Sequence, residues 1–355
     1  MKLTVDESIK EIPFYPKAAL YGCEDGWTRL ASNENPHPPS SKVVNSILES
    51  VFSITRYPES EYELKALVAA KFGLEPENIV IGNGSNELIE TAFKGMRHPT
   101  RKRVLVHGPS FAFYSIAASI YGYETRLIRF PDLTVDLEVV LKNVDESVRI
   151  VFLNNPNNPT GTIFEDAAFK SFLDRLPREV LVVADEAYAE FATSSTFPKS
   201  MAYIKDYPLL VLRTFSKAYG LAGLRVGYGV ADTSIASFIE RTKQPFSVNM
   251  MALVAAKAAL SDDSYVAKVL ESNRQGRDFF YSLFAELGLT FVPTEANFVL
   301  VHIGPDAEGL TKKLLGKKIL VRWMGAYELP EYIRVTVGTM EENKTFAQGL
   351  RSLLT

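Results

Sequence analysis

The chain has 355 residues, with 39 lysines and arginines against 42 aspartates and glutamates, which gives a formal net charge of −3. Its hydrophobic fraction of 46% and charged fraction of 23% are typical of a globular protein and exclude a disordered, collagen-like or coiled-coil chain. The near balance of charge gives no sign of a nucleic-acid or anionic-lipid partner, so we expect a small molecule as ligand. At about 100 to 200 residues per domain, the length predicts one large or two ordinary domains.

Cysteine content and the N-terminus indicate the compartment. Cys23 is the single cysteine, so it forms no disulfide within the chain, and a reducing compartment is expected. The N-terminus carries acidic residues in place of an apolar signal segment. The most apolar long window, 111–123, is shorter than the roughly 18 residues that a membrane span needs. We therefore expect a cytoplasmic protein with no membrane partner.

Short β-branched runs that end abruptly in small or polar residues recur through much of the chain. The predicted strands lie at 78–81, 103–106, 149–153, 180–183, 209–212 and 224–229. Near-continuous apolar strands are buried on both faces, which indicates an α/β fold with a mostly parallel sheet between helices. Ligands bind at the carboxyl ends of the strands in such sheets, so the polar residues that follow these strands should meet at one site.

The pattern changes after about residue 246. A long helical stretch at 265–287 precedes predicted strands at 297–303, 319–322 and 332–337 and a C-terminal helix. This order predicts a smaller α+β domain. The expected parts are an N-terminal segment, 1–45, that packs with the small domain, a large domain, 46–246, and the small domain, 247–355.

Charged residues beside apolar strands are costly unless they are paired or functional. Lys217 follows the strand at 209–212, where a desolvated amine could form a Schiff base. Arg225, in an expected strand, needs either a phosphate or a carboxylate of the chain itself. Asp185 ends the most apolar strand as a helix N-cap or a functional charge, and Tyr188 could lie on the same side. A Schiff-base lysine and an aspartate that pairs with a pyridinium are the two groups that pyridoxal 5′-phosphate chemistry needs.

Other strand ends carry weaker signals. The segment 82–87, Gly-Asn-Gly-Ser-Asn-Glu, turns a strand into a helix whose first N–H groups could bind phosphate, although an ordinary βα turn explains it as well. Asn158 lies in a rigid turn and could donate to a ligand oxygen. Phe111 could be a core residue or stack on an aromatic cofactor. Arg322 and Arg334, in late strands, could bind carboxylate or phosphate or form surface salt bridges.

Several other chemistries lack their sequence signals. The four histidines, His37, His98, His107 and His302, show no metal-ligand spacing. The chain also has no Gly-x-Ser-x-Gly elbow and no P-loop lysine. We therefore expect no metal site and no hydrolase or kinase activity.

Several motifs together resemble a known family. The segment 214–223 followed by Arg225 resembles the pyridoxal-phosphate attachment signature of class II aminotransferases, and 157–161 and 184–188 occur in that family's order and spacing. The segments 31–36, 56–58 and 333–338 are similar to those of the histidinol-phosphate aminotransferase family. The resemblance covers nearly the whole chain. It implies a fold-type-I enzyme that binds pyridoxal phosphate, in a homodimer with active sites at the subunit interface.

The resemblance also implies a role for each matching residue. Lys217 would form the Schiff base with the cofactor and later move a proton at the substrate, and Asp185 would pair with the pyridine nitrogen. The catalytic residues would be Lys217, Asp185 and Tyr188. The remaining cofactor-binding residues would be Ser85, Asn86, Phe111, Asn158, Thr214, Ser216, Arg225 and, from the other subunit, Tyr57. The substrate-binding residues would be Tyr15, Asn35, Arg322 and Arg334.

The implied reaction transfers an amino group between L-histidinol phosphate and 2-oxoglutarate in histidine biosynthesis. Alternatives are a lyase resembling threonine-phosphate decarboxylase, an aromatic amino acid aminotransferase, and a non-catalytic protein of the same fold. Two residues depart from the family pattern: Asn86, where relatives commonly have aspartate, and Pro38, where they have glycine. The first should spare phosphate binding if backbone N–H groups do most of it, whereas the second lies in a segment near the substrate.

Overall fold

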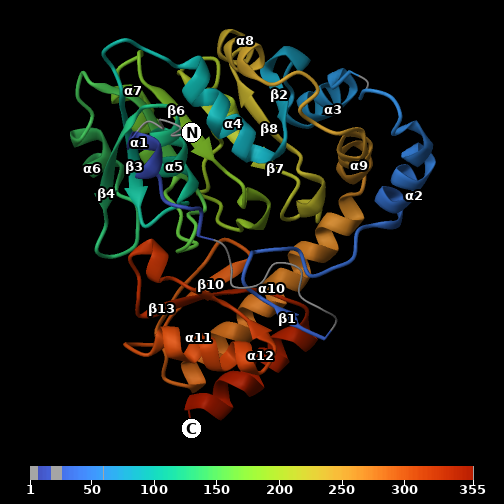
Figure 1. Ribbon diagram of the computed structural model, residues 1–355, viewed down its shortest axis with the longest axis vertical. Coiled ribbons are helices and arrows are strands. Elements are labelled where there is room, and N and C mark those ends of the chain that lie inside the picture. The colour runs from blue at the N-terminus through green and yellow to red at the C-terminus, as the bar shows by residue number, and fades with distance from the viewer. Residues whose placement is uncertain (1–6, 17–25, 59, 355) are drawn as a thin grey trace, which may run out of the picture.

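The computed structural model of the chain describes residues 7–16, 26–58 and 60–354. Cys23 lies outside the described residues. Two units are visible, an upper one built on a large sheet and a lower one that contains the C-terminus (Figure 1). The helices are α1 (Glu7–Lys10), α2 (Ser41–Ser50), α3 (Tyr62–Phe72), α4 (Gly84–Gly95), α5 (Phe113–Ile120), α6 (Leu137–Lys142), α7 (Asp166–Arg175), α8 (Thr233–Thr242), α9 (Met250–Leu260), α10 (Asp263–Glu286), α11 (Ala307–Gly316) and α12 (Met340–Leu354).

The large sheet has seven strands in the order β2-β8-β7-β6-β5-β3-β4. The strands are β2 (Ile79–Gly82), β3 (Arg103–Gly108), β4 (Glu124–Arg129), β5 (Val148–Asn154), β6 (Leu181–Asp185), β7 (Leu209–Thr214) and β8 (Gly227–Ala231). β8 runs opposite to the other six strands, so its pairings with β2 and β7 are antiparallel and the remaining pairings are parallel. The predicted α/β fold with a mostly parallel sheet is therefore confirmed.

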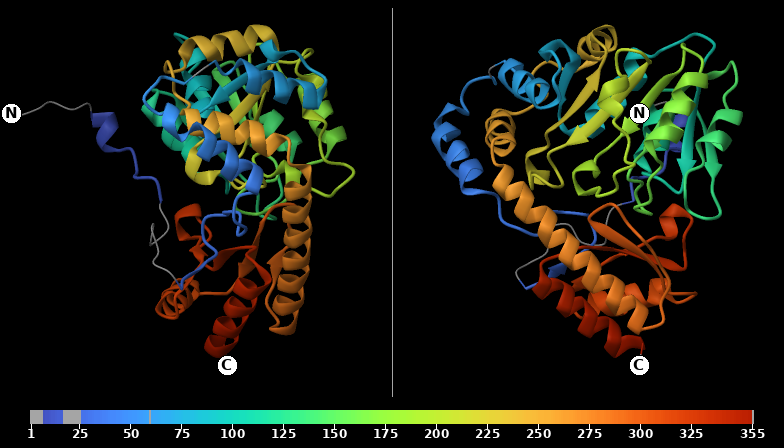
Figure 2. Two further views of the ribbon diagram at one scale, coloured as in Figure 1. Left: turned by 90° about the vertical axis from the view of Figure 1, so that its right-hand side faces the viewer. Right: turned by 180° about the vertical axis from the view of Figure 1, so that it is seen from behind.

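The strands of the large sheet other than β4 are buried along most of their length and pack on both faces, as apolar strands do, whereas β4 at the sheet edge is polar and partly exposed. In β2, Ile79 and Ile81 belong to the core cluster that includes Val68 of α3, while Val80 belongs to the cluster that includes Leu88 of α4. This alternation follows from the two-residue period of a strand. Helices accordingly cover both faces of the sheet (Figure 2).

The smaller unit combines the C-terminal part of the chain with the N-terminal segment around Thr28–Arg29, while helix α1 lies against α5 of the large unit. The strands β12 (Arg322–Trp323), β13 (Tyr332–Thr336), β10 (Phe298–His302) and β9 (Phe291–Val292) form an antiparallel sheet in this order. A separate two-stranded sheet pairs β1 (Thr28–Arg29) with β11 (Ile319–Leu320) in parallel. Leu30 N–H and C=O bond to Leu320 and Thr336, so the N-terminal segment is held against the C-terminal strands.

Two helices near the predicted domain limits, residues 45 and 246, both pack with the large unit. The limits themselves remain predictions. Helix α2 spans the expected boundary at residue 45, and its Val43 belongs to a core cluster of the large unit. Helix α9 lies beyond the expected boundary at residue 246, yet Ala252 and Ala256 belong to the same cluster. Helix α10 then crosses from the large unit into the small one (Figure 1). An apolar helical pattern does not indicate which of two units the helix packs against.

Candidate active site

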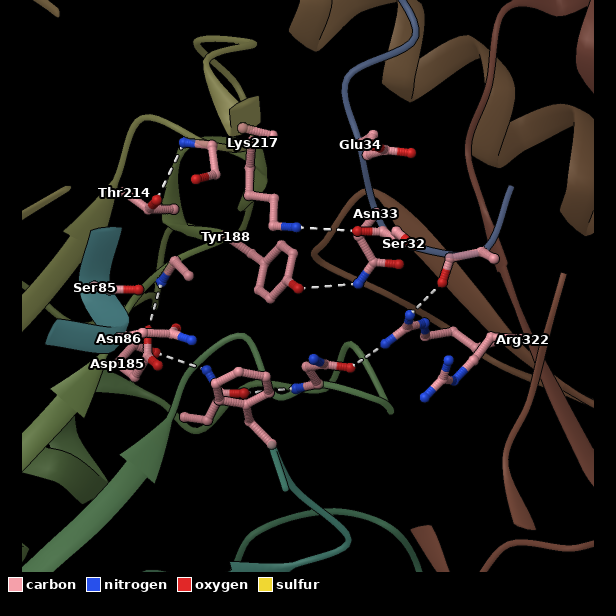
Figure 3. Close-up of a pocket in the computed structure, with 18 of the residues that line it drawn as sticks. Ser32, Asn33, Glu34, Ser85, Asn86, Asp185, Tyr188, Thr214, Lys217 and Arg322 are labelled. Carbon is pink, nitrogen blue, oxygen red and sulfur yellow. Dashed lines mark hydrogen bonds between the residues drawn. The ribbon is translucent and has the colours of Figure 1, made fainter. Parts of the chain in front are cut away.

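A cavity of about 480 Å³ lies where the carboxyl ends of the large sheet's parallel strands meet the small unit. Most of the residues that the sequence singles out line this cavity (Figure 3). They are Tyr15, Ser85, Asn86, Phe111, Asn158, Asp185, Tyr188, Thr214, Ser216, Lys217, Arg225, Arg322 and Arg334. The parallel register aligns Asn154 of β5 with Asp185 of β6, which explains why strand-end residues distant in sequence meet at one edge.

Lys217 follows β7 by a short turn and extends into the cavity (Figure 3). Its Nζ donates to the carbonyl oxygen of Ser32 at 3.2 Å and lies 5.7 Å from the centroid of the Tyr188 ring. Burial, followed by the positive charge of Arg334, lowers the pKa of the Lys217 amine to about 8. A lysine of this kind is partly neutral near physiological pH, and the neutral amine is the nucleophile and base.

Asp185 is buried at the end of β6, with 3% of its surface exposed. Its Oδ2 accepts a hydrogen bond from Tyr114 Oη at 2.7 Å, and its Oδ1 accepts one from Ala187 N at 3.2 Å. No lysine or arginine of the described chain forms an ion pair with it, and burial raises its pKa to about 6. A buried carboxyl group without a cationic partner suits a ligand that brings its own positive charge.

A second polar group lies where α4 begins. The helix starts without a side-chain cap, so the N–H groups of its first turn, which includes Ser85 and Asn86, are suited to an anion. Arg225 Nη1 donates to Ala222 O at 3.0 Å and lies 3.5 Å from Ser216 Oγ. Gly84 has φ +70°, and a Cβ there would lie 2.6 Å from Arg225 Nη2. Glycine therefore permits the close approach of this arginine to the helix start.

The prediction that Arg225 lies in a buried strand is wrong. The residue lies in a turn just before β8 begins at Gly227, is exposed, and has φ +57°. The left-handed conformation interrupts the extended backbone. The Arg225 side chain therefore points to the cavity and not into the interior of the sheet. The apolar residues on either side gave the misleading strand pattern.

The opposite side of the cavity carries two arginines. Arg334 is buried, and it donates from Nη2 to Ala31 O at 2.8 Å and from Nη1 to Asn158 Oδ1. Its Nε has no hydrogen-bond partner within the described residues, and burial lowers its pKa from the usual value. Arg322 donates from Nη2 to Pro16 O. An orphaned buried donor and two guanidinium groups on one wall suit an anionic substrate group.

Tyr188 and Asn158 occupy the middle of the cavity wall. Tyr188 Oη accepts a hydrogen bond from Asn33 Nδ2 at 2.9 Å, and burial raises its pKa to about 12, so the hydroxyl keeps its proton. Asn158 was expected to donate to a ligand oxygen. Because its Oδ1 accepts from Arg334, its Nδ2 remains the donor end that can serve this purpose.

Two predicted site residues do not line the cavity. Asn35 donates from Nδ2 to Ala218 O at 3.1 Å, so in this structure it ties the N-terminal segment to the loop that carries Lys217. The contact of Asn35 with substrate stays a prediction. Tyr57 is 78% exposed and stacks on Phe246, with ring centroids 4.8 Å apart.

Sequence reasoning gave no role to several residues in or behind the cavity wall, of which Tyr114, Asn33 and Tyr327 carry hydroxyl or amide groups. Tyr114 lies one helical turn after Phe111, in a window that was interpreted only as apolar. Asn33 belongs to a segment that the resemblance used without giving this residue a role. Tyr327 lines the cavity from the small unit, and no nearby motif indicates it. Among the described residues, no cluster of three or more metal-ligating side chains occurs and no helix could span a membrane.

Comparisons with known proteins show the family of the chain. The family described as aminotransferase class I and II matches residues 25–350. The chain is 42% identical to a histidinol-phosphate aminotransferase of Moorella thermoacetica over 329 residues, which cover 92% of this chain and 85% of that protein.

Solved structures show the same fold. The structure of histidinol-phosphate aminotransferase from Sinorhizobium meliloti in complex with pyridoxal-5′-phosphate superposes with a TM-score of 0.86 at 29% identity, and covers 92% of this chain and 91% of that one. An L-threonine-O-3-phosphate decarboxylase from Porphyromonas gingivalis has a TM-score of 0.80 at 24% identity, covering 92% and 99%, so it shares the fold alone. The chain belongs to the class I and II aminotransferase family.

Proposed function

We propose that this aminotransferase uses pyridoxal 5′-phosphate to transfer the amino group between L-histidinol phosphate and 2-oxoglutarate, a step of histidine biosynthesis. The observation that carries the proposal is one cavity in which a half-buried amine, Lys217, lies between two separate anion-binding groups. One group is the α4 start with Arg225, and the other is the pair Arg322 and Arg334. The names of full-length relatives support the choice of amino donor.

The described residues fit the cofactor. Asp185 is a buried carboxyl group without a cationic partner in the described chain, as a pyridinium nitrogen requires. The uncapped start of α4 and Arg225 suit the cofactor's phosphate. Lys217 offers an amine for its aldehyde, and Phe111 lies at the cavity wall where it can stack on an aromatic ring.

When bound, pyridoxal 5′-phosphate supplies an aldehyde for amines and an aromatic ring that withdraws electrons from the substrate's α-carbon. Lys217 Nζ, partly neutral because of its lowered pKa, would accept the proton from that carbon and return it to the carbon of the cofactor's former aldehyde group. Asp185 would keep a proton on the cofactor's ring nitrogen, and Tyr188 Oη, which stays protonated, would be the donor for the ring's phenolic oxygen.

The two arginines of the small unit orient the substrates. Both candidate substrates carry an anion, a phosphate in one case and carboxylates in the other, and a guanidinium binds either in a bidentate way. Each terminal nitrogen of Arg334 carries two N–H groups and donates one of them, to Asn158 Oδ1 or to Ala31 O, so each keeps a second N–H for an anion.

We further propose that two chains form a homodimer. Large apolar side chains are exposed along α2, the 3₁₀ turn at Val51–Ser53 and the segment that follows, including Leu48, Phe52, Ile54 and Tyr57. An exposed apolar surface of this kind is typical of a subunit interface. Because Tyr57 does not reach the cavity of its own chain, it can contribute to the site of a second copy.

Mixed chains test this arrangement. Lys217→Ala and Tyr57→Ala chains, each deficient alone, are dissociated and reassembled together. If the site uses Tyr57 of the other chain, a mixed dimer contains one intact site, so activity returns. If each chain builds its own site, mixing restores nothing.

A single-turnover assay tests the substrate. The protein loaded with pyridoxal 5′-phosphate is mixed with L-histidinol phosphate, and formation of pyridoxamine 5′-phosphate is followed by absorbance. Rapid conversion, reversed by 2-oxoglutarate, is expected. Conversion by phenylalanine or tyrosine but not by histidinol phosphate would overturn the substrate choice, and release of carbon dioxide from threonine phosphate would indicate a lyase.

A further inference from the structure

Asp185 has a hydroxyl partner behind the cavity wall. Tyr114 Oη donates to Asp185 Oδ2 at 2.7 Å, a short hydrogen bond between two fully buried side chains. Tyr114 does not line the cavity, so it cannot touch a ligand directly. Whatever this hydroxyl contributes to the chemistry must pass through the carboxyl group.

The Tyr114 ring is fixed on several sides. It is stacked on Phe152 of β5, with centroids 4.7 Å apart, and meets Phe111 edge to face at 5.5 Å. Because aromatic packing immobilises the ring, the hydroxyl is held in position before any ligand binds. Phe111 is also the residue we assign to stacking on the cofactor. It lies just before α5 and its C=O accepts from Tyr114 N at 3.2 Å, so the start of α5 supports both the ring face and the carboxyl group.

The Tyr114 hydroxyl stays a hydrogen-bond donor to Asp185. Burial, followed by the charge of Asp185, raises the pKa of Tyr114 well above its usual value, so the phenol remains protonated. The hydrogen bond therefore favours the ionised form of Asp185 and opposes the effect of burial on its pKa. The other ionisable groups whose charges act on Asp185 are Glu186, which follows it in the chain and pairs with Arg213, Lys217 after β7, and Tyr188.

We propose that Tyr114 is a positioning residue of the transamination site, whose hydroxyl keeps Asp185 ionised and oriented so that the ring nitrogen of the cofactor retains its proton. This inference rests on the proposed cofactor but not on the proposed substrate. Without the hydroxyl, the carboxyl group loses a donor inside an apolar wall, and its proton affinity rises. Hydrogen bonds to charged groups are worth enough to change such an equilibrium by roughly tenfold to hundredfold.

Tyr114→Phe removes the hydroxyl and keeps the packed ring. Tyr123→Phe is the matched control, because Tyr123 Oη donates to Phe93 O at 3.2 Å in the same core cluster and has no contact with Asp185. Both variants lose one buried phenolic donor. A purely structural effect should therefore be similar in the two.

The test uses readouts other than turnover. In the apoprotein labelled with [γ-¹³C]aspartate, NMR titration should show the Asp185 pKa raised by about one unit or more in Tyr114→Phe and unchanged in Tyr123→Phe. The dissociation constant of pyridoxal 5′-phosphate should increase roughly tenfold or more in Tyr114→Phe alone. The affinity for the carbocyclic analogue, in which C–H replaces the ring nitrogen, should not change.

The outcomes separate the inference from the proposed function. If wild-type protein fails to bind pyridoxal 5′-phosphate at Lys217, the proposed function is wrong. If wild-type protein binds it and Tyr114→Phe matches Tyr123→Phe in the Asp185 titration and in affinity, only the role of Tyr114 is overturned. If Tyr114→Phe binds pyridoxal 5′-phosphate and the carbocyclic analogue with equally reduced affinity, the role of Tyr114 is also overturned. The hydroxyl would then act by packing and not through the ring nitrogen.

Discussion

The two walls of the cavity are built in different ways. The sheet wall takes Asp185, Ser216 and Lys217 from strand ends and the turns directly after them, on elements fixed by a core on both sides. The small-unit wall takes Tyr15 and Arg322 from segments far apart in the chain, and Arg322 is held to the N-terminal segment by Pro16 O. One wall is a continuous folded layer, and the other is assembled from the chain's ends.

This difference matches the tasks that we propose for the two walls. A cofactor that stays in place through every turnover needs a preorganised surface, and strand ends in a packed sheet provide one. Two substrates that alternate in one site need anion-binding groups that accept both a phosphate and a carboxylate. Changes in the sheet wall should therefore affect the chemical step and cofactor binding, whereas changes in the small-unit wall should affect the substrates.

Lys217→Ala should have the largest effect on the sheet wall. Removal of the amine removes both the attachment group and the proton carrier, and loss of a positioned acid-base group typically slows a reaction by about 10² to 10⁴-fold. Single-turnover absorbance with L-histidinol phosphate measures the rate. Lys71→Ala, which removes an exposed lysine that donates to Tyr219 Oη, is the control and should stay near wild type. A Lys217→Ala rate near wild type would show that another group carries the proton.

Asp185→Asn should show how much the free energy of unfolding of the apoprotein is lowered by a buried carboxyl group without a cationic partner. The relevant pKa is that of wild-type Asp185. Its pKa is raised from 3.8 to about 6, so the folded apoprotein holds the proton more tightly and loses stability as pH rises between these values. The loss amounts to about 3 kcal/mol. Urea unfolding of apoprotein at pH values across this window should show wild type losing about this much relative to Asp185→Asn.

Bound cofactor should reverse the order of stability of wild type and Asp185→Asn. When a pyridinium pairs with Asp185, the carboxylate is stabilised, so wild type loaded with pyridoxal 5′-phosphate should be more stable than loaded Asp185→Asn at neutral pH. An Asp185→Asn protein that gains equal stability from the cofactor would contradict the pairing.

Arg334→Lys should separate the small-unit wall from the sheet wall. Lysine keeps the charge but loses the planar fork, so the KM for 2-oxoglutarate should rise by roughly tenfold while the dissociation constant of the cofactor stays unchanged. Steady-state kinetics and cofactor titration measure the two quantities. Arg274→Lys, on the exposed face of α10, is the control. Weaker cofactor binding with unchanged KM would contradict this division of tasks between the walls.

The sheet wall could be predicted from the sequence more fully than the small-unit wall. Asp185 and Lys217 follow contiguous apolar strands, and parallel strands bring their carboxyl ends to one edge, so local patterns suffice. Arg334 also lies in a strand that the apolar pattern predicts, but its contacts with Asn158 and Ala31 depend on how the two units pack. No local pattern contains that information.

Three features that the sequence did not predict, the contact of Tyr114, the direction of β8 and the turn at Arg225, also depend on packing or backbone conformation. The contact of Tyr114 with Asp185 depends on how α5 packs against the end of β6, which no spacing indicates. The direction of β8 was not evident because a fully buried strand is apolar in either orientation. Arg225 lies between apolar residues as a strand residue would, and only its positive φ places it in a turn.

Chemical trapping of the cofactor tests the central claim most directly. Purified protein loaded with pyridoxal 5′-phosphate is reduced with borohydride, digested and mapped by mass spectrometry. We expect the pyridoxyl group on the peptide that contains Lys217, with loss of transamination in proportion to labelling. A label on another lysine, or none on a protein that still transaminates, would contradict the assignment of this cavity as the cofactor site.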